Sequence, residues 1–195
     1  MNRQILSLAA AALFACSAAH SAVVINVTES GGSVLFNTSG SLDLTGATNV
    51  GSYGSYGLGI IPGGSNWYLA SGSAGPVVGY AFTAFDGPFG TSTNYFSSPT
   101  TSTGDEFAIW GNGGATEQVL LSGRYVSGGA ISSQMSFAGS SFASLSLNAG
   151  TYVYTLPSDT VTLIIGGSNP VPEPGSLALV GAALVGLASL RRRKA

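Results

Sequence analysis

The side chains able to perform chemistry are unevenly distributed along this 195-residue chain. Its one cysteine and one histidine, Cys16 and His20, both lie near the N-terminus. The chain after His20 therefore contains no thiol and no imidazole. Disulfide frameworks, Cys or His metal sites and His-dependent triads are therefore excluded from residues 23–170.

Carboxylates are the remaining candidates for acid, base or metal chemistry. Residues 23–170 contain seven: Glu29, Asp43, Asp86, Asp105, Glu106, Glu117 and Asp159. Asp105 and Glu106 are the only adjacent pair, and neighbours on a strand point to opposite faces. One of them, with Asp43, Asp86 or Asp159 nearby, could ligate Ca²⁺ through oxygen, but no EF-hand spacing supports this. We favour solvated strand ends and expect no metal.

Enzyme motifs are incomplete. A glycosidase needs two carboxylates about 5–9.5 Å apart, and seven acids produce such a pair by chance. Residues 71–75 lack the first glycine and the histidine base that a nucleophile elbow requires. Residues 111–114 lack the third glycine and the helix of a dinucleotide fingerprint. We therefore expect no catalytic residues and no cofactor, with a carboxylate hydrolase as the weakest alternative.

Aromatic side chains provide one candidate binding surface. Aromatic faces stack on pyranose rings in many carbohydrate-binding modules, and five residues could form such a platform: Tyr53, Tyr56, Trp67, Tyr68 and Trp110. The alternative, which we favour, places Trp67 and Trp110 in the core of a β-sandwich.

Charge excludes one class of partner. Charged residues make up only 7% of the chain, against roughly 25% in typical soluble domains. Residues 23–170 carry one arginine, Arg124, and seven acids, a formal charge of −6. Such a segment cannot neutralise phosphates, so nucleic acid is not an expected partner.

Residues 1–22 have the pattern of a secretory signal peptide. Arg3 supplies the positive end, and an apolar run follows from Ile5 to Ala15. Small residues then permit cleavage by signal peptidase after Ala19, Ser21 or Ala22. An alternative treats residues 13–16 as a lipobox with Cys16 as the lipidation site.

The C-terminal residues 169–195 have three parts. Val171, Pro172, Glu173 and Pro174 form a stiff, extended segment, because two prolines surround one acid. An uncharged run over 175–190 predicts a short transmembrane helix. Its 15 residues after Gly175 span about 22 Å of a roughly 30 Å core, and snorkelling and local thinning can supply the difference. The chain then ends in a basic cluster that stays cytoplasmic: Arg191, Arg192, Arg193 and Lys194.

These three parts, in this order, resemble the PEP-CTERM sorting tail of exported bacterial proteins. The resemblance implies that an exosortase-type membrane protease recognises residues 171–174 and removes the tail. A permanent single-span anchor is the alternative. The same tail segment is also known as an ice-binding protein C-terminal domain, a label that carries no ice-binding activity over to the rest of the chain.

The body, residues 23–168, is predicted to be all-β. Period-two alternation recurs at 23–28, 42–45, 131–137 and 145–147. Further short runs are expected as strands at 60–61, 67–70, 77–82, 107–110 and 119–121. The clearest hairpin joins 151–156 to 160–165 through Pro157-Ser158-Asp159, and 51–57 is expected to be a low-complexity loop. About ten strands without helices predict an antiparallel β-sandwich or jelly roll.

The body also resembles a recurrent group of PEP-CTERM proteins. The matching pieces are 39–46, 142–147 leading into 150–154, and a closing strand over 159–165. Members of that group usually carry a tryptophan near Tyr154, which this chain lacks. The resemblance implies an extracellular β-domain without an established activity.

Together these features predict a non-enzymatic exported protein of the cell surface or biofilm matrix. A precursor anchored in the inner membrane would be processed at its tail and then reach the surface or the medium. The second hypothesis is a carbohydrate-binding module that acts on exopolysaccharide.

Overall fold

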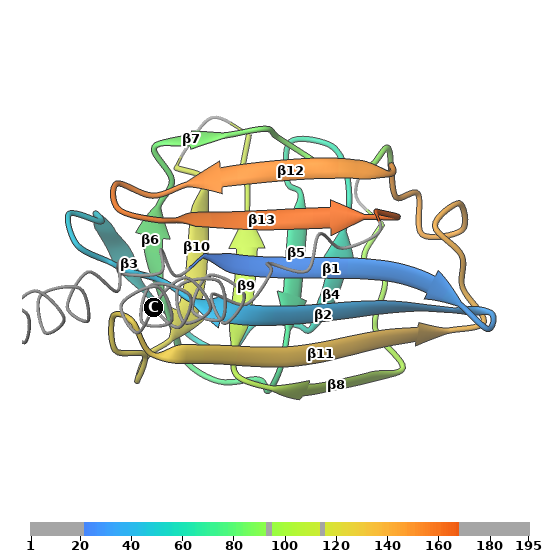
Figure 1. Ribbon diagram of the computed structural model, residues 1–195, viewed down its shortest axis with the longest axis horizontal. Coiled ribbons are helices and arrows are strands. Elements are labelled where there is room, and N and C mark those ends of the chain that lie inside the picture. Colours follow the sequence, from blue (N-terminus) through green and yellow to red (C-terminus); the bar gives the residue numbers. More distant parts are fainter. Residues whose placement is uncertain (1–21, 93–94, 114–115, 168–195) are drawn as a thin grey trace, which may run out of the picture.

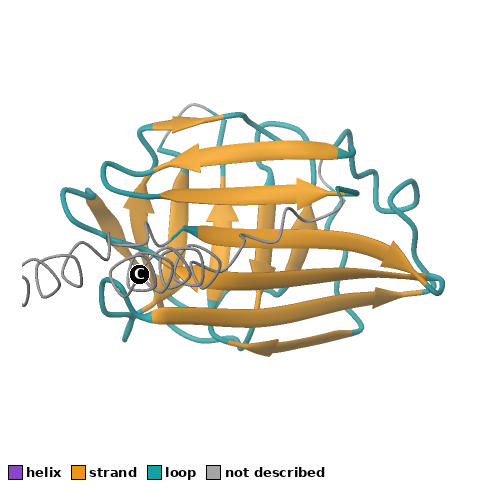
Figure 2. Ribbon diagram, viewed as in Figure 1, coloured by secondary structure: helices purple, strands orange, loops and turns teal. Residues whose placement is uncertain are grey.

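A computed structural model describes residues 22–92, 95–113 and 116–167. The predicted signal helix, Cys16 and the sorting tail lie outside these residues. Figure 2 shows strands and loops throughout the part that is described. In that part there is also no helix long and apolar enough to cross a membrane.

The body consists of thirteen strands in two sheets. The strands are β1 (Val23–Ser30), β2 (Ser33–Ser41), β3 (Asn49–Tyr53), β4 (Gly59–Ile61), β5 (Tyr68–Ser71), β6 (Val77–Ala81), β7 (Ala84–Phe85), β8 (Thr101–Gly104), β9 (Phe107–Trp110), β10 (Gln118–Ser122), β11 (Ala130–Ala138), β12 (Gly150–Thr155) and β13 (Thr160–Ile165).

The seven-stranded sheet, sheet A, has the order β7-β12-β13-β1-β2-β11-β8. Its first and last strands in sequence, β1 and β13, are parallel neighbours, with Val23 beside Val161 and Val27 beside Ile165. Its other pairs are antiparallel. The prediction of a wholly antiparallel sandwich is therefore wrong at this pair, which joins strands from the two ends of the body.

The six-stranded sheet, sheet B, has the order β3-β6-β10-β9-β5-β4 and is antiparallel throughout. Figure 1 shows the strands of sheet A running across those of sheet B, which lies behind it. The two sheets thus form a sandwich of the crossed kind rather than the aligned kind. The predicted all-β sandwich is confirmed.

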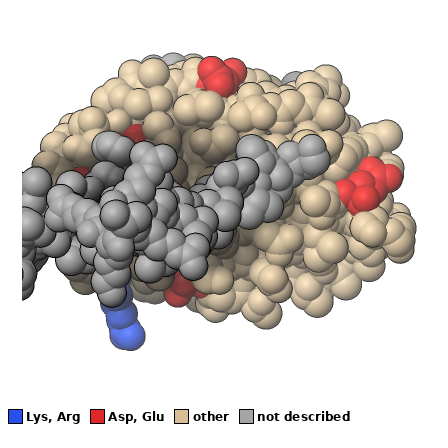
Figure 3. Space-filling view, viewed as in Figure 1, with Lys and Arg blue, Asp and Glu red and all other residues tan. Residues whose placement is uncertain are grey.

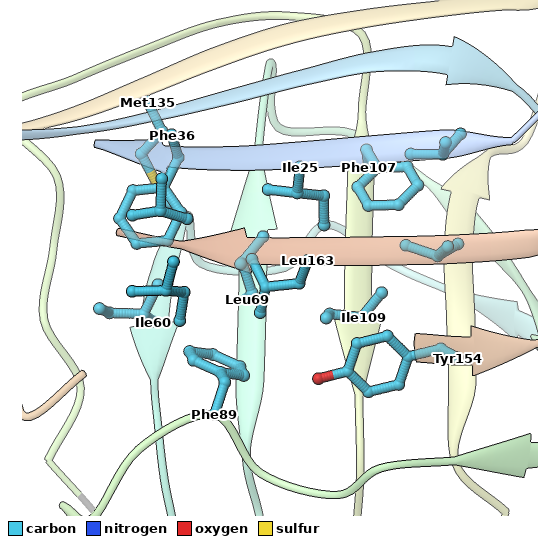
Figure 4. Packing of buried hydrophobic residues seen from close by; sticks show 14 of the residues in the cluster. Ile25, Phe36, Ile60, Leu69, Phe89, Phe107, Ile109, Met135, Tyr154 and Leu163 are labelled. Atoms are coloured by element: carbon cyan, nitrogen blue, oxygen red, sulfur yellow. The ribbon is translucent and has the colours of Figure 1, made fainter. Parts of the chain in front are cut away.

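The main core fills the space between the sheets. Alternate residues of each strand point inward, and Ile25 and Leu163 from sheet A meet Leu69 and Ile109 from sheet B (Figure 4). All four are fully buried. Each such side chain contributes roughly 1.5–3 kcal/mol relative to its exposed state, so this body needs no disulfide.

Two predicted strands are loops. Leu42 is buried as expected, but β2 ends at Ser41. The strand ends there because side-chain oxygens accept the backbone N–H groups of the next two residues. The Leu42 N–H donates to the Tyr125 hydroxyl, and the Asp43 N–H donates to the Asp159 carboxylate. These bonds replace a sheet ladder.

The segment at 145–147 is also not a strand. Its N–H groups donate to the carbonyls of Ser141, Ala143 and Phe142, which folds the segment into local turns. Leu145 and Leu147 are nevertheless buried. The opposite error occurs at the predicted loop 51–57, where Gly51–Tyr53 belong to β3. Strands β2, β7 and β8 were not predicted. Neither β7 nor β8 alternates apolar and polar residues.

The corner after β5 ties the two sheets together. The Ser71 hydroxyl lies 2.7 Å from the Ser133 hydroxyl of sheet A, and both residues are buried. Gly72 follows with φ +93°, and a Cβ there would overlap the Asp105 carbonyl oxygen. Its N–H donates to the Ser102 hydroxyl, and its carbonyl accepts from the same hydroxyl. The predicted loop at 71–75 therefore begins at a glycine that no other residue can replace without strain.

We predict that Gly72→Ala lowers the free energy of unfolding by about 3 kcal/mol, because strain and a steric clash add. Gly31→Ala is the matched control, since Gly31 also has a positive φ (+59°) but has nothing within 4 Å of an added Cβ. The control is expected to lose only about 1 kcal/mol. Urea denaturation measures both, and equal losses would contradict the argument.

Candidate functional site

The predicted sorting residues follow the body directly. Val171 to Pro174 and Arg191 to Lys194 lie outside the described residues, as does Cys16. The described part ends at Gly167, just after β13. Gly166 is still part of the fold, because its N–H donates to the Val27 carbonyl over 3.0 Å. The body thus presents its C-terminal extension from the end of a central strand.

The carboxylates of the body serve mostly as backbone acceptors. Five of the seven accept a backbone N–H. Four accept it from another loop or strand: Glu29 from Phe142, Asp86 from Val153, Asp105 from Ser132, and Asp159 from Asp43. Asp43 accepts the Thr45 N–H within its own loop. Such bonds hold loops against strand ends. The interpretation of these acids as strand-end groups fits this arrangement better than a pair of facing catalytic acids.

Asp43 and Asp159 come closest to a cluster. Both lie beside Tyr125, whose hydroxyl proton can go to the Gly129 carbonyl at 2.9 Å or to the Leu42 carbonyl at 3.1 Å. Hydrogen bonds from Thr45 hold the pKa of Asp43 below its ordinary value. Within the described ranges, no three His, Cys, Asp or Glu side chains gather to hold one ion. The Ca²⁺ hypothesis therefore gains no ligand set in this part of the chain.

The five aromatic residues of the proposed platform do not share one surface. Trp67 is 2% exposed and packs in the main core, with its ring centroid 5.3 Å from that of Tyr154. The other four gather on the outer face of sheet B: Tyr53, Tyr56, Tyr68 and Trp110. The predicted five-residue platform and the alternative, in which both tryptophans are core residues, are thus each correct in part. Trp67 is a core residue, whereas Trp110 belongs to a partly exposed cluster.

This outer cluster is held together by its own rings. Tyr56 lies on the loop after β3, and its ring centroid is 6.0 Å from Trp110 and 6.1 Å from Tyr68. The Tyr68 hydroxyl donates to the Gly57 carbonyl over 2.9 Å, which fixes the same loop. Burial raises the pKa of Tyr68 above its ordinary value. The rings therefore contact each other in edge-to-face and tilted arrangements, and Tyr53, Tyr56 and Trp110 stay partly exposed.

A groove lies beside the cluster, at the start of β9 and the end of β10. It encloses about 450 Å³ and is lined by Ala74, Gly75, Pro76, Glu106, Ser122, Gly123 and Arg124. A recess of about 20 Å³ adjoins it, with Tyr56 and Tyr68 in its wall, and shares Glu106. Gly75 has no room for a Cβ because the Glu106 carboxylate lies against it. Glu106 and Arg124 were not predicted to line one groove, because the pairing of Leu121 with Phe107 brings the ends of their strands together only in the folded sheet.

The two glycine segments have structural explanations. Ser71 and Gly72 form the corner described above. Gly111 follows β9, and a Cβ there would overlap the Trp67 indole, so this glycine permits close packing. Its N–H donates to the Trp67 carbonyl over 3.0 Å.

A β-sandwich followed at once by a proline–acid–proline segment, an apolar run and a basic end defines an exported protein with a C-terminal sorting tail. Residues 170–194 match the family model of the PEP-CTERM protein-sorting motif. The chain therefore carries a PEP-CTERM protein-sorting motif, the kind of signal that exosortase substrates have at their C-terminal end. No curated protein and no solved structure matched it.

The outer cluster yields a prediction about stability. Tyr56→Ala removes the ring that covers Trp110 and Tyr68, and it should cost about 2 kcal/mol of unfolding free energy. The fluorescence emission of Trp110 should shift to longer wavelength as water reaches the indole. Tyr95→Ala is the control, because Tyr95 is 70% exposed and should change stability by less than about 0.5 kcal/mol. An unshifted emission spectrum for Tyr56→Ala would contradict the packing described.

Proposed function

We propose that this protein is a non-enzymatic component of the cell surface or biofilm matrix, delivered by exosortase processing of its tail. The observation that carries the proposal is the sorting motif at 170–194, which begins within a few residues of the last strand of the body. A complete β-sandwich joined this closely to a removable tail suggests that the released sandwich is the functional unit.

The tail residues have separate roles in this proposal. Val171, Pro172, Glu173 and Pro174 form the segment that the exosortase recognises. The run at 175–190 holds the precursor in the inner membrane, and Arg191 to Lys194 stop its transfer on the cytoplasmic side. Residues 1–22 direct export and are removed by signal peptidase.

The composition of the body supports a structural role. Figure 3 shows that charged side chains are sparse on the face in view. The outward-facing positions of sheet A are mostly uncharged and polar, such as Asn26, Asn37 and Gln134, which lie side by side across three strands. A surface of hydroxyl and amide groups suits hydrated polymers, and most carboxylates are already used within the fold.

The intact mass of the native protein, taken from the outer surface and the medium, tests this proposal. We expect a C-terminus within or next to residues 171–174. Glu173→Ala should abolish most of the processing, because it removes the one charge of the recognised segment. Glu117→Ala is the matched control and should be processed normally. Wild-type protein that retains its tail through Ala195 would exclude processing.

A second candidate function is binding of exopolysaccharide by the body. The observation that favours it is the groove lined by both Glu106 and Arg124. The volume of this groove, about 450 Å³, lies within the usual range of ligand pockets. A carboxylate accepts hydrogen bonds from sugar hydroxyls, and a guanidinium pairs with the carboxylate of an acidic sugar. Tyr56 and Tyr68 would add apolar contact at one side.

Affinity electrophoresis in acidic and neutral exopolysaccharides tests this second function. Arg124→Gln should weaken retardation by an acidic polymer at least tenfold, which corresponds to about 1.4 kcal/mol. Glu117→Gln alters an acid outside the groove lining and should leave retardation unchanged. If the wild-type protein migrates equally with and without every polymer, the groove is not a polysaccharide site.

A further inference from the structure

The recess beside the groove is small and has an apolar floor. It encloses about 20 Å³, which is room for about one group of the size of a water molecule or a methyl. The floor is the outer face of sheet B, where Ala108 pairs with Ala70 on one side and with Leu120 on the other. Tyr56, on the loop after β3, forms part of the wall. The recess exists because two neighbouring alanines leave space under this ring.

Several hydroxyl groups border the recess, but they already form hydrogen bonds within the fold. The Tyr68 hydroxyl donates to a carbonyl of the loop after β3, and the Ser73 hydroxyl donates to the Gly104 carbonyl. The Ser71 hydroxyl is paired with that of Ser133. A water molecule in a cavity needs two to four polar partners, whereas a methyl group needs none. The recess therefore suits a small apolar group better than it suits water.

The recess and the groove form one continuous site. Ala74, Gly75 and Glu106 line both cavities. Arg124 lines only the groove; it is exposed, and it is the one cation between residues 22 and 167. A ligand in the groove can therefore place an anionic group at Arg124 and a small apolar group in the recess at the same time.

We propose that the recess selects methyl-bearing sugars of an acidic polysaccharide. It takes the methyl group of an acetyl substituent or of a 6-deoxy sugar, while a carboxylate of the same polymer pairs with Arg124. A pyranose ring is too large for the recess, so the ring stays in the groove and only its substituent enters. Glu106, at the boundary between the two cavities, accepts hydrogen bonds from neighbouring sugar hydroxyls. This inference rests on the second proposed function, the binding of exopolysaccharide, and specifies which sugars the groove prefers.

The preference follows from the burial of one methyl group. Removing such a group from water strengthens binding about fourfold. A bare hydroxyl gains nothing from the recess, because it would lose its hydrogen bonds to water on entering. The expected selectivity is therefore modest for each sugar but measurable for each polymer.

Affinity electrophoresis of the full chain in mild detergent tests this selectivity with three polymers. They are O-acetylated polymannuronate, the same polymer after alkaline removal of its acetyl groups, and an acetyl-free polymer of glucuronic acid and rhamnose. Physiological ionic strength limits repulsion between the acidic body and the polymers to about 8 Å. We expect a Kd about fourfold lower for the acetylated than for the deacetylated polymer. The rhamnose polymer distinguishes the two sources of the methyl group, because its methyl belongs to a 6-deoxy sugar.

Variants that fill the recess test its role directly. Ala108→Val adds two methyl groups to the floor, so it should raise the Kd for the acetylated polymer to that for the deacetylated one and leave the latter unchanged. Ala130→Val is the matched control, because Ala130 is an exposed strand residue outside the recess lining, and it should keep the preference. Arg124→Gln should weaken binding of both polymers by the same factor. Ala74→Leu, at an exposed position on the boundary, narrows the recess without disturbing the core, and it replaces Ala108→Val if that variant does not fold.

Two results would overturn the inference while leaving polysaccharide binding in place. One is an equal Kd of the wild-type protein for the acetylated and deacetylated polymers. The other is a preference that survives in the folded recess variants. If none of the three polymers retards the wild-type protein, the second proposed function itself is refuted, together with the selectivity that rests on it.

Discussion

The parallel pairing of β1 with β13 is the constraint on which the rest of the sandwich depends. It places strands from the two ends of the body side by side in the middle of sheet A, and every other strand of that sheet is added outward from this pair. A parallel pair cannot form through a tight turn, so the whole intervening chain has to return to the same sheet. Sheet B is the crossing layer built during that return.

Polar groups within the body mostly stabilise the path of the backbone. Asp105, Glu29 and Asp86 are examples. Each carboxylate could in principle serve catalysis or metal binding, but each accepts a backbone N–H where a loop meets a strand end. The Tyr125 hydroxyl also accepts a backbone N–H, that of Leu42, and its own proton can go to the Gly129 carbonyl. Few charges remain for electrostatic steering of a partner, and two of them, Glu106 and Arg124, line the groove.

Period-two alternation predicted β1, β11 and the hairpin of β12 and β13, because those segments obtain their hydrogen bonds from neighbouring strands. It did not predict β2, the central neighbour of β1. It failed at 42–45, where the partners are side chains at Tyr125, Ser127 and Asp159, more than 80 residues away. The sequence alone could have shown that the five aromatic residues do not share one surface. Trp67 and Tyr68 are adjacent in an extended segment, so they must face opposite sides. The groove of Glu106 and Arg124 was not predictable, since it depends on how β9 and β10 meet a distant loop.

The scarcity of cations in the body has a consequence for its survival outside the cell. Proteases that cleave after lysine or arginine find a single target between residues 22 and 167, the bond between Arg124 and Tyr125. That bond lies in a loop whose tyrosine is fixed by hydrogen bonds to the distant Leu42 and, within the same loop, to Gly129. Proteases bind their substrates as extended, adaptable segments, and this loop would have to release Tyr125 first. A sandwich of this composition is suited to persist among secreted trypsin-like enzymes.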